Sequence, residues 1–246
     1  MKKPELLAPA GNLEKLKVAV HYGADAVYLS GKSYGPRSFA GNFTIPQMEE
    51  GIKLAREEEV KVYVTVNIFP RNDDLKGIPE YLNILQQLSV DAIIVSDPGI
   101  IDMARRLIPG MTLHLSTQAN TTNWQSVRFW KDQGISRVNL ARELSFSEIK
   151  YIKRKVDTEI EIFVHGAMCI SYSGRCLLSN YLTNRDSNRG ECSQPCRWRY
   201  TLMEESRPDT YLPIFQDKHG SYILSSKDLC LLAYIPVLIH LPQGLC

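Results

Sequence analysis

The chain has 246 residues, of which 44% are hydrophobic and 23% are charged, and its formal net charge is +2. These proportions are close to the average for globular proteins, so the composition excludes disordered and collagen-like chains. No apolar run approaches the ~18 residues that a membrane-spanning helix needs, and the N-terminal Met-Lys-Lys-Pro-Glu lacks the apolar core of a signal peptide. We therefore expect a cytoplasmic protein of one or two domains, without membrane contact.

The first 165 residues alternate short apolar runs with stretches of helical periodicity, which is typical of α/β proteins. The predicted strands, in chain order, are 5–10, 25–30, 61–66, 92–95, 112–116, 137–140 and 159–164. The predicted helices between them are 13–21, 46–58, 78–88, 99–107, 123–133 and 146–155. Each strand–helix–strand unit returns the chain in the same direction, so the seven strands are expected to form a parallel sheet.

An internal repeat refines this fold prediction. Similar phrases occur where a helix ends and a strand begins, at Gly23-Ala-Asp-Ala-Val27, Val90-Asp-Ala-Ile93 and Gly134-Ile-Ser-Arg-Val138. This repeat, and a count of βα units past six, favour a TIM-like (β/α) barrel over an open doubly wound sheet.

Polar side chains follow the predicted strands at their C-terminal ends, which meet at one mouth of a (β/α) barrel and form its active site. The residues at these positions are Asn67, Asp97, Gln118, Asn120, Arg142, Glu143 and His165. Any one of them has an ordinary explanation, because loop tips are polar in most proteins. Together they predict a catalytic site that includes Asn67, Gln118, Arg142 and His165.

All six cysteines lie after residue 168, which argues against a disulfide scaffold and suggests metal binding or catalysis in a reducing compartment. Four of them fall within 28 residues, as the pairs Cys169-x6-Cys176 and Cys192-x3-Cys196. Thiolates are ligands for zinc and for iron–sulfur clusters, and this spacing leaves both possibilities open. Four buried thiols without a ligand are the structural alternative.

The residues around these cysteines resemble a known family. The run Glu161-x-Phe-x-x-Gly-Ala-Met-Cys169-x6-Cys176-Leu-Leu-Ser179 is similar to the signature of peptidase family U32, the collagenase-like peptidases. Further similar blocks are Glu5-Leu-Leu-Ala-Pro-Ala-Gly11, Gly23-Ala-Asp-Ala-Val-Tyr28, Asn180-Tyr-Leu-Thr-Asn-Arg185, Cys192-Ser-Gln-Pro-Cys-Arg197 and Ser226-Lys-Asp-Leu-Cys230. The resemblance extends from residue 4 to about residue 236.

What the resemblance implies differs from the family's name. Its better understood members hydroxylate the wobble uridine of tRNA or a ribosomal cytidine, and carry a 4Fe–4S cluster on four cysteines. The N-terminal block looks most like the tRNA-hydroxylating branch, for which prephenate is the implied oxygen source and tRNA the partner, with a paralogous subunit as a further expected partner. By this resemblance Cys169, Cys176, Cys192 and Cys196 are the cluster ligands, and Cys230 is an alternate to Cys196.

Two other functions stay open on the residues alone. His165 lies four residues before Cys169, so the two side chains are a candidate base and nucleophile for a cysteine peptidase. A cysteine bound to a cluster cannot also be a free nucleophile, so this alternative and the iron–sulfur one exclude each other. The third function is that of a zinc-stabilised RNA-binding module without catalysis.

Local charge around the cysteines favours an RNA partner. Residues 171–200 hold five arginines (175, 185, 189, 197 and 199) against Asp186 and Glu191. Arg175, Arg185, Arg189 and Arg197 are the predicted phosphate contacts, and the aromatic residues Tyr172, Tyr181, Trp198 and Tyr200 are able to stack on unpaired bases. An ordinary solvated surface with long arginine side chains is the competing explanation.

The C-terminal end departs from the family pattern. The resemblance leads us to expect a helix and then an eighth strand after Pro236, but residues 237–246 match neither. We therefore predict a barrel at 1–165 without its eighth strand, a cysteine-rich metal-binding segment at 166–230 and a truncated or divergent tail at 231–246. Cys246 falls outside every matched block.

Overall fold

The computed structural model describes residues 3–35, 42–169, 171–198, 200–213, 216–217, 220–221 and 228–239. Arg199, Ser226, Lys227 and Cys246, which enter the sequence-based predictions, lie outside these ranges. No helix within the ranges is long and apolar enough to cross a membrane.

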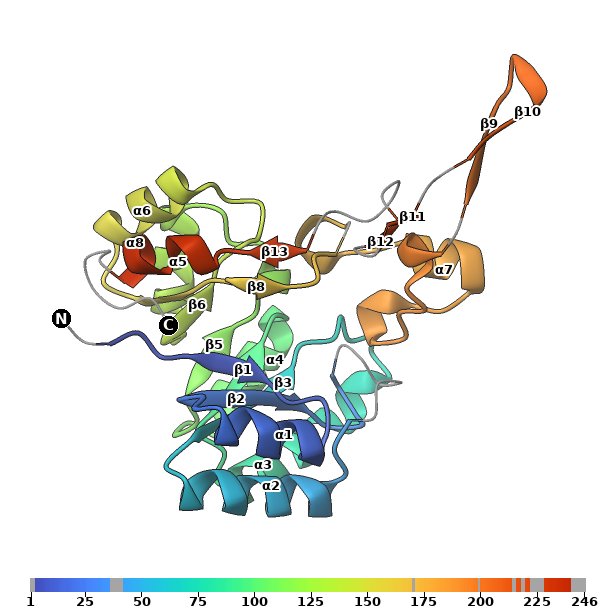
Figure 1. The fold of residues 1–246 in the computed structure, drawn as a ribbon. Helices are drawn as coiled ribbons and strands as arrows, with labels where there is room; N and C mark the ends of the chain where they lie inside the picture. Colours follow the sequence, from blue (N-terminus) through green and yellow to red (C-terminus); the bar gives the residue numbers. More distant parts are fainter. Residues whose placement is uncertain are drawn as a thin grey trace.

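Seven parallel strands form one sheet in the order β1 to β7, which curls into an open half-barrel with helices on its outer side (Figure 1). The strands are Leu7–Pro9 (β1), Ala26–Ser30 (β2), Lys61–Val66 (β3), Ala92–Val95 (β4), Leu113–Leu115 (β5), Arg137–Asn139 (β6) and Glu159–Glu161 (β7). The helices are Leu13–His21 (α1), Ile45–Glu57 (α2), Ile78–Gln87 (α3), Pro98–Leu107 (α4), Trp124–Asp132 (α5) and Phe146–Lys155 (α6). The predicted α/β architecture with seven parallel strands is confirmed, and within the described ranges the main sheet has these seven strands.

Side chains at the helix starts explain where the helices begin. Thr44 and Gln47 form a capping box before α2, whose first turn accommodates Pro46, and Ser145 and Glu148 do the same for α6. These hydrogen bonds satisfy backbone N–H groups that have no partner inside a helix.

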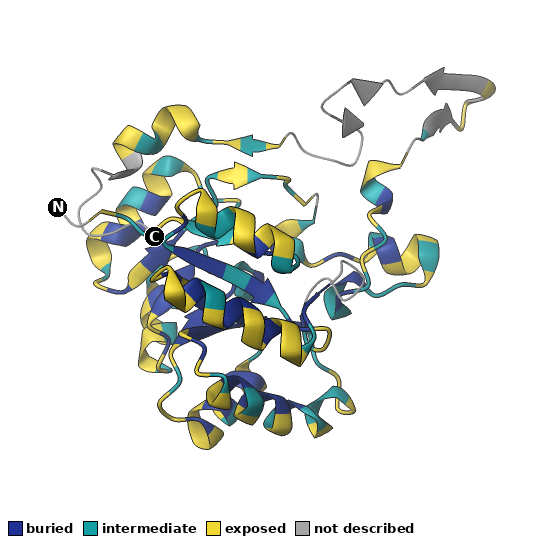
Figure 2. Ribbon diagram, turned by 60° about the horizontal axis from the view of Figure 1, so that its bottom comes forward, coloured by how far each residue is buried: buried dark blue, intermediate teal, exposed yellow. Residues whose placement is uncertain are grey.

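The two faces of the sheet differ in what they contact. Val62, Val64, Ile93 and Val95 belong to the large apolar core that the helices cover, as Figure 2 shows by the buried colour of the sheet. Tyr63, Ile94 and their neighbours on alternate positions point into the half-barrel, because successive strand residues face opposite sides. The interior is therefore narrower and more polar than the helix-covered face.

Charged residues hold the half-barrel together at the N-terminal ends of its strands. Arg137 donates from Nη1 to Glu5 Oε1 at 2.7 Å and pairs through Nη2 with Glu159 at 2.9 Å. Glu5 also accepts from Lys61 Nζ at 2.9 Å and from the Tyr63 hydroxyl at 2.8 Å. Burial alone would raise the pKa of Glu5, but hydrogen bonds from Arg137, Lys61 and Tyr63 outweigh it and hold the pKa at about 2.

The chain after β7 differs from the sequence-based prediction. β7 ends at Glu161, three residues earlier than predicted, and His165–Gly166 (β8) pairs antiparallel with Leu229–Cys230 (β13) outside the main sheet. The Leu231 N–H donates to the Val164 carbonyl at 2.8 Å, so Val164 contacts the returning chain, while Ile162 still packs against the main core.

Between β8 and β13 the chain forms short elements and a hairpin that projects from the molecule (Figure 1). These elements are Tyr172–Gly174 (η3), Leu178–Thr183 (α7), Ser187–Arg189 (η4), Pro195–Arg197 (η5), Thr201–Glu204 (β9), Arg207–Pro213 (β10), Gln216–Asp217 (β11) and Gly220–Ser221 (β12). Leu232–Tyr234 (η6) and Ile235–Ile239 (α8) follow β13.

Replacing Arg137 tests whether the charged network stabilises the half-barrel. The variant Arg137→Ala leaves Glu5 buried without its main partner, so the free energy of unfolding is expected to fall by about 3–5 kcal/mol. Arg106→Ala is the control, because the Arg106–Asp102 pair is exposed and its loss is expected to cost about 0.5 kcal/mol or less. Urea unfolding measures both, and equal losses in the two variants would contradict the prediction.

Candidate functional site

Buried polar side chains gather at the C-terminal ends of β3, β4 and β5. Asn67 Nδ2 donates to Ser116 Oγ at 3.0 Å, and Ser96 Oγ donates to the Asn67 carbonyl at 3.3 Å. Gln118, just after β5, is also buried. The structure therefore places the predicted Asn67 and Gln118 at one end of the half-barrel, beneath the surface.

Several polar atoms at this end have no hydrogen-bond partner within the described part of the chain. They are Asn67 Oδ1, Gln118 Oε1, Asn139 Oδ1 and Arg142 Nε. A buried polar group without a partner costs about 1–3 kcal/mol, so such groups are rare and usually mark a place where a bound molecule supplies the missing bond. Three amide oxygens and one guanidinium nitrogen suit a polar ligand with both donors and acceptors.

Glu161 is a site residue that the sequence analysis did not select. Its Oε1 accepts a hydrogen bond from Asn139 Nδ2 at 2.7 Å, and burial raises the pKa of the carboxyl to about 7, partly opposed by Arg137 and reinforced by Glu5. Side chains on a strand alternate between its two faces, and Ile160 packs in the helix-covered core. The next residue, Glu161, therefore faces the interior of the half-barrel, and this alternation is the sequence signal for its position.

The cysteine-rich segment, residues 169–198, is attached to the same strand ends. The Ser173 N–H donates to Glu143 Oε1 at 2.6 Å, and the Ser173 hydroxyl lies 3.0 Å from both Glu143 Oε2 and Asn120 Oδ1. Gly174 has φ +78°, and a side chain there would come within 3.5 Å of Arg142. Arg142 itself lies over the Phe163 ring, 5.9 Å from its centroid.

Two of the predicted RNA-binding arginines take part in this attachment. Arg175 donates from Nε and Nη2 to the Gln118 carbonyl at 3.3 and 3.2 Å, and Arg189 pairs with Asp74 at 2.6 Å. A third contact joins Arg71 to Asp186 at 3.1 Å. The loops after β3 and β5 therefore hold the segment across the strand ends. Of the other two predicted arginines, Arg185 is half-buried, whereas Arg197 is exposed.

The four predicted ligand thiols share one neighbourhood. The pKa of Cys196 is raised by burial and then by the thiols of Cys169, Cys192 and Cys176. Burial also acts to raise the pKa of Cys176, but hydrogen bonds from the Ser171 and Ser187 side chains and from the backbone of Ser179 and Leu178 lower it overall. Donors aimed at sulfur stabilise the thiolate, which is the form that binds metals.

Backbone hydrogen bonds add to this environment. The N–H of Ser171 donates to Cys169 Sγ and that of Gln194 donates to Cys192 Sγ, each at 3.4 Å. Hydrogen bonds to sulfur are among the features that set the potential of an iron–sulfur cluster. This donor set therefore fits a group held by thiolates.

Over the described ranges, no three His, Cys, Asp or Glu side chains are arranged to hold a single ion. Four thiolates on one zinc would lie about 3.8 Å apart, because the Zn–S bonds are about 2.3 Å and tetrahedral. A 4Fe–4S cluster binds each thiolate through a different iron, so its four ligand sulfurs are spread more widely. Thiolates are suitable ligands for either group.

His165 and Cys230 lie together, and Cys230 is not among the three thiols that raise the pKa of Cys196. They are register partners in the β8–β13 ribbon, and both side chains are exposed. His165 was predicted to follow strand seven at the mouth, but the early end of β7 places it in this ribbon. No contact shows that it acts with Arg142, Gln118 or Asn67, and its catalytic role stays a prediction.

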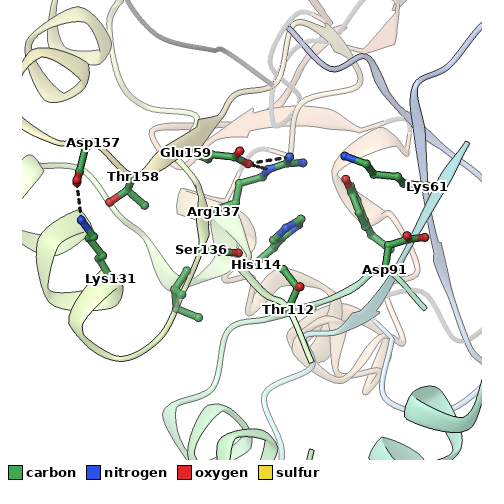
Figure 3. Close-up of a pocket in the computed structure, with 12 residues that line it drawn as sticks. Lys61, Asp91, Thr112, His114, Lys131, Ser136, Arg137, Asp157, Thr158 and Glu159 are labelled. Carbon is green, nitrogen blue, oxygen red and sulfur yellow. Dashed lines mark hydrogen bonds and ion pairs between the residues drawn. The ribbon is translucent and has the colours of Figure 1, made fainter. Parts of the chain in front are cut away.

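A second polar region lies at the opposite end of the strands. A cavity of about 450 Å³ is lined there by Arg137, His114, Lys131 and Glu159 among others (Figure 3). Lys131 pairs with Asp157 and Arg137 pairs with Glu159, as the dashed lines in Figure 3 show, so these cations are neutralised. Burial and the nearby Arg137 lower the pKa of His114 to about 3, and the ring is uncharged at neutral pH.

Comparison with known proteins identifies the family. A model described as Peptidase family U32 matches residues 11–243. The chain belongs to this family. It is 52% identical over 240 residues to tRNA hydroxylation protein P1 of Bacillus subtilis (strain 168), with 98% of this chain and 57% of that protein covered. It is 41% identical over 275 residues to tRNA hydroxylation protein P of Escherichia coli (strain K12), with 96% and 61% covered.

The chain thus spans about 60% of the length of these curated relatives. Among solved structures, the U32 peptidase Mk0906 is similar in fold, with a TM-score of 0.58, 15% identity, and 68% of this chain and 72% of that chain covered. The family resemblance seen in the sequence is confirmed.

The raised pKa of Glu161 makes stability depend on pH. The folded carboxyl has a pKa of about 7 against 4.5 for the free group, so its contribution is complete below pH 4.5 and is lost as the pH rises through 7. The wild type is expected to lose about 3 kcal/mol more than Glu161→Gln across this range, because Gln stays neutral. Urea unfolding at several pH values measures the difference, and parallel pH profiles would contradict it.

Proposed function

We propose that this chain takes part in the hydroxylation of tRNA at a wobble uridine, with a 4Fe–4S cluster on Cys169, Cys176, Cys192 and Cys196. The observation that carries the proposal is the identity of 52% and 41% to two proteins named for tRNA hydroxylation, over nearly the whole of this chain. The placement of four thiols on a segment attached over unpaired polar groups supports it independently.

The strand ends offer the groups that a substrate site needs. A pyrimidine presents donors and acceptors along its edge, and the amide oxygens of Asn67, Gln118 and Asn139 are acceptors without partners. Arg142 supplies a guanidinium that suits the carboxylates of prephenate, the proposed oxygen source. A nucleotide must leave its stack to reach such a site, as in other enzymes that modify bases.

Glu161 adds a group that is able to hold or release a proton near neutral pH. Its hydrogen bond from Asn139 keeps the carboxyl in the interior, next to an unpaired amide oxygen. The cysteine-rich segment is attached across this end, and a cluster held by its four cysteines would supply a centre for electron transfer. A tRNA substrate also implies a cytoplasmic location.

Removing one thiol tests the ligand assignment. Cys169→Ser, purified without oxygen, is expected to lose the visible absorption of an iron–sulfur cluster and most of its iron and sulfide, because a hydroxyl is a poor ligand for soft iron. Cys230→Ser is the comparison that tests the alternate ligand, and it is expected to keep the cluster, because Cys230 lies in the β8–β13 ribbon and is not among the thiols that act on Cys196.

Elemental analysis of the wild type decides between the metals. About four irons with matching sulfide support the cluster. One zinc per chain and no colour would favour the zinc-stabilised RNA-binding module, and a metal-free protein that cleaves peptides through Cys169 would favour the peptidase.

Nucleoside analysis tests the substrate. Deleting the gene in its own host is expected to lower 5-hydroxyuridine derivatives in bulk tRNA, and a plasmid copy is expected to restore them. Deletion of any paralogue in the same strain removes redundancy as an explanation. Unchanged hydroxyuridine in the multiple deletion would refute the tRNA assignment and leave the cluster assignment standing.

A further inference from the structure

Helix α7, in the middle of the cysteine-rich segment, has its polarity reversed. Ser179 is fully buried, whereas Leu177 at the start of the helix is 78% exposed and Tyr181 is 85% exposed. Helices in water normally bury apolar side chains and expose polar ones, because burial of apolar surface is the main stabilising contribution. The burial of a polar side chain and the exposure of apolar ones therefore each require a physical reason.

The buried face is polar because it organises the segment. The Ser193 N–H donates to Ser179 Oγ at 3.1 Å, and Thr183 Oγ1 lies 2.8 Å from Ser193 Oγ. Backbone groups of Leu178 and Ser179 also bond the Cys176 thiol. The Cys176 thiol and the turn that carries Cys192 need hydrogen-bond partners, which hydroxyl and backbone amide groups on this face supply.

The exposed face has no such requirement, yet beside Asn180 it carries large apolar and aromatic side chains. The Tyr181 N–H donates to the Leu177 carbonyl at 2.9 Å, so the two residues are one helical turn apart and on the same side of α7. Leu182 is 42% exposed, and Trp198, at the end of the neighbouring η5, is 45% exposed. We call Leu177, Tyr181, Leu182 and Trp198 the α7 surface.

The position of the α7 surface is suited to contact with a large partner. α7 and η5 pack together and lie at the outer edge of the molecule, beyond the C-terminal ends of the strands (Figure 1). The proposed chemistry occurs on the inner side of the same segment. A molecule lying on this surface is therefore able to extend one nucleotide toward the strand ends.

Charge selects among the partners. Residues 171–198 contain four arginines, no lysine and two carboxylates, so this segment alone accounts for an excess equal to the +2 of the whole chain. Arg197 stands next to Trp198, and its pairing with Asp228 is long, at 3.8 Å. Aromatic faces beside the Arg197 guanidinium suit unpaired bases and phosphates, whereas an apolar protein partner would gain nothing from that charge.

We propose that the α7 surface binds the unpaired loop of an RNA stem–loop by stacking, with Tyr181 as its main contact. This proposal rests on the proposed function for the kind of RNA. It narrows the expectation from sequence, because Arg175 and Arg189 attach the segment to the barrel, whereas Tyr181 and Trp198, two of the predicted stacking residues, are exposed.

The test uses the full chain, purified without oxygen, and a fluorescent anticodon stem–loop transcript with uridine at the first anticodon position. Binding is followed by anisotropy, with the same stem closed into a blunt duplex as the comparison RNA. Tyr181→Ala is expected to weaken binding to the loop about tenfold, because loss of one stacked base costs that much in other proteins. Tyr181→Phe keeps the aromatic face and is expected to bind like the wild type.

Tyr22→Ala is the matched control, because Tyr22 is 82% exposed and follows α1 on the half-barrel. Tyr22→Ala is expected to leave the affinity for the loop unchanged. The thermal unfolding temperature and the visible spectrum are expected to stay unchanged in all three variants. Equal affinities for Tyr181→Ala and the wild type would overturn the proposal. An equal loss of affinity for the blunt duplex in Tyr181→Ala would also overturn it. The same holds if light scattering shows that Tyr181→Ala weakens binding because the protein no longer self-associates.

The two proposals fail separately. If the wild type does not bind the loop, the proposal that the α7 surface binds RNA is wrong. The nucleoside analysis still decides whether tRNA is the substrate. Loss of hydroxyuridine in the deletion strain together with unimpaired binding by Tyr181→Ala would keep the function and place the RNA contact elsewhere.

Discussion

The ion pair between Glu5 and Arg137 closes an otherwise open sheet. β1 and β7 are the two edges of the seven-stranded sheet, and no described strand joins them. Arg137 reaches across the interior from β6 to Glu5 just before β1, and binds Glu159 of β7 with its other nitrogen. The curvature of the sheet, and with it the convergence of the strand ends, depends on this bridge.

The network also explains why the two ends of the strands differ. At the N-terminal end Glu5, Lys61 and Arg137 satisfy one another, and this end resembles a structural layer. At the C-terminal end Asn67, Gln118 and Arg142 each keep an unpaired polar atom. The charged network and the unpaired amide and guanidinium groups thus lie at opposite ends of the strands, the ends that (β/α) barrels use for stability and for active sites respectively. Glu161 lies between them and is influenced by charges from the N-terminal end.

Much of the fold could be predicted because its determinants are local. α1 and α6 have the predicted bounds, and the capping residues Thr44 and Ser145 are visible in the sequence. The prediction of β7 was wrong at its end, because residues 162–164 are strand-like by composition and the hydrogen bond of Val164 with Leu231 depends on chain more than sixty residues away. Local patterns carry no information about such pairing.

The same limit applies to the site. The shared neighbourhood of the four cysteines and the placement of Asn67 and Gln118 at the strand ends could be predicted from motif and position, since type and spacing are enough for that. The attachment roles of Arg175 and Arg189 were not, because a charge is visible in the sequence but its partner is not; Asp74 is 115 positions before Arg189. Glu161 was missed as a site residue because its pKa depends on burial within the folded half-barrel.

The chain between residues 166 and 229 is a long insertion whose two ends meet in the β8–β13 ribbon. We call it the excursion. The entropy of closing such a loop grows only with the logarithm of its length, about 0.6 kcal/mol for each doubling. Insertions or deletions in the projecting β9–β10 hairpin are therefore inexpensive for folding of the barrel. The excursion is a place where chain length can change freely while the thiols and strand ends keep their relative positions.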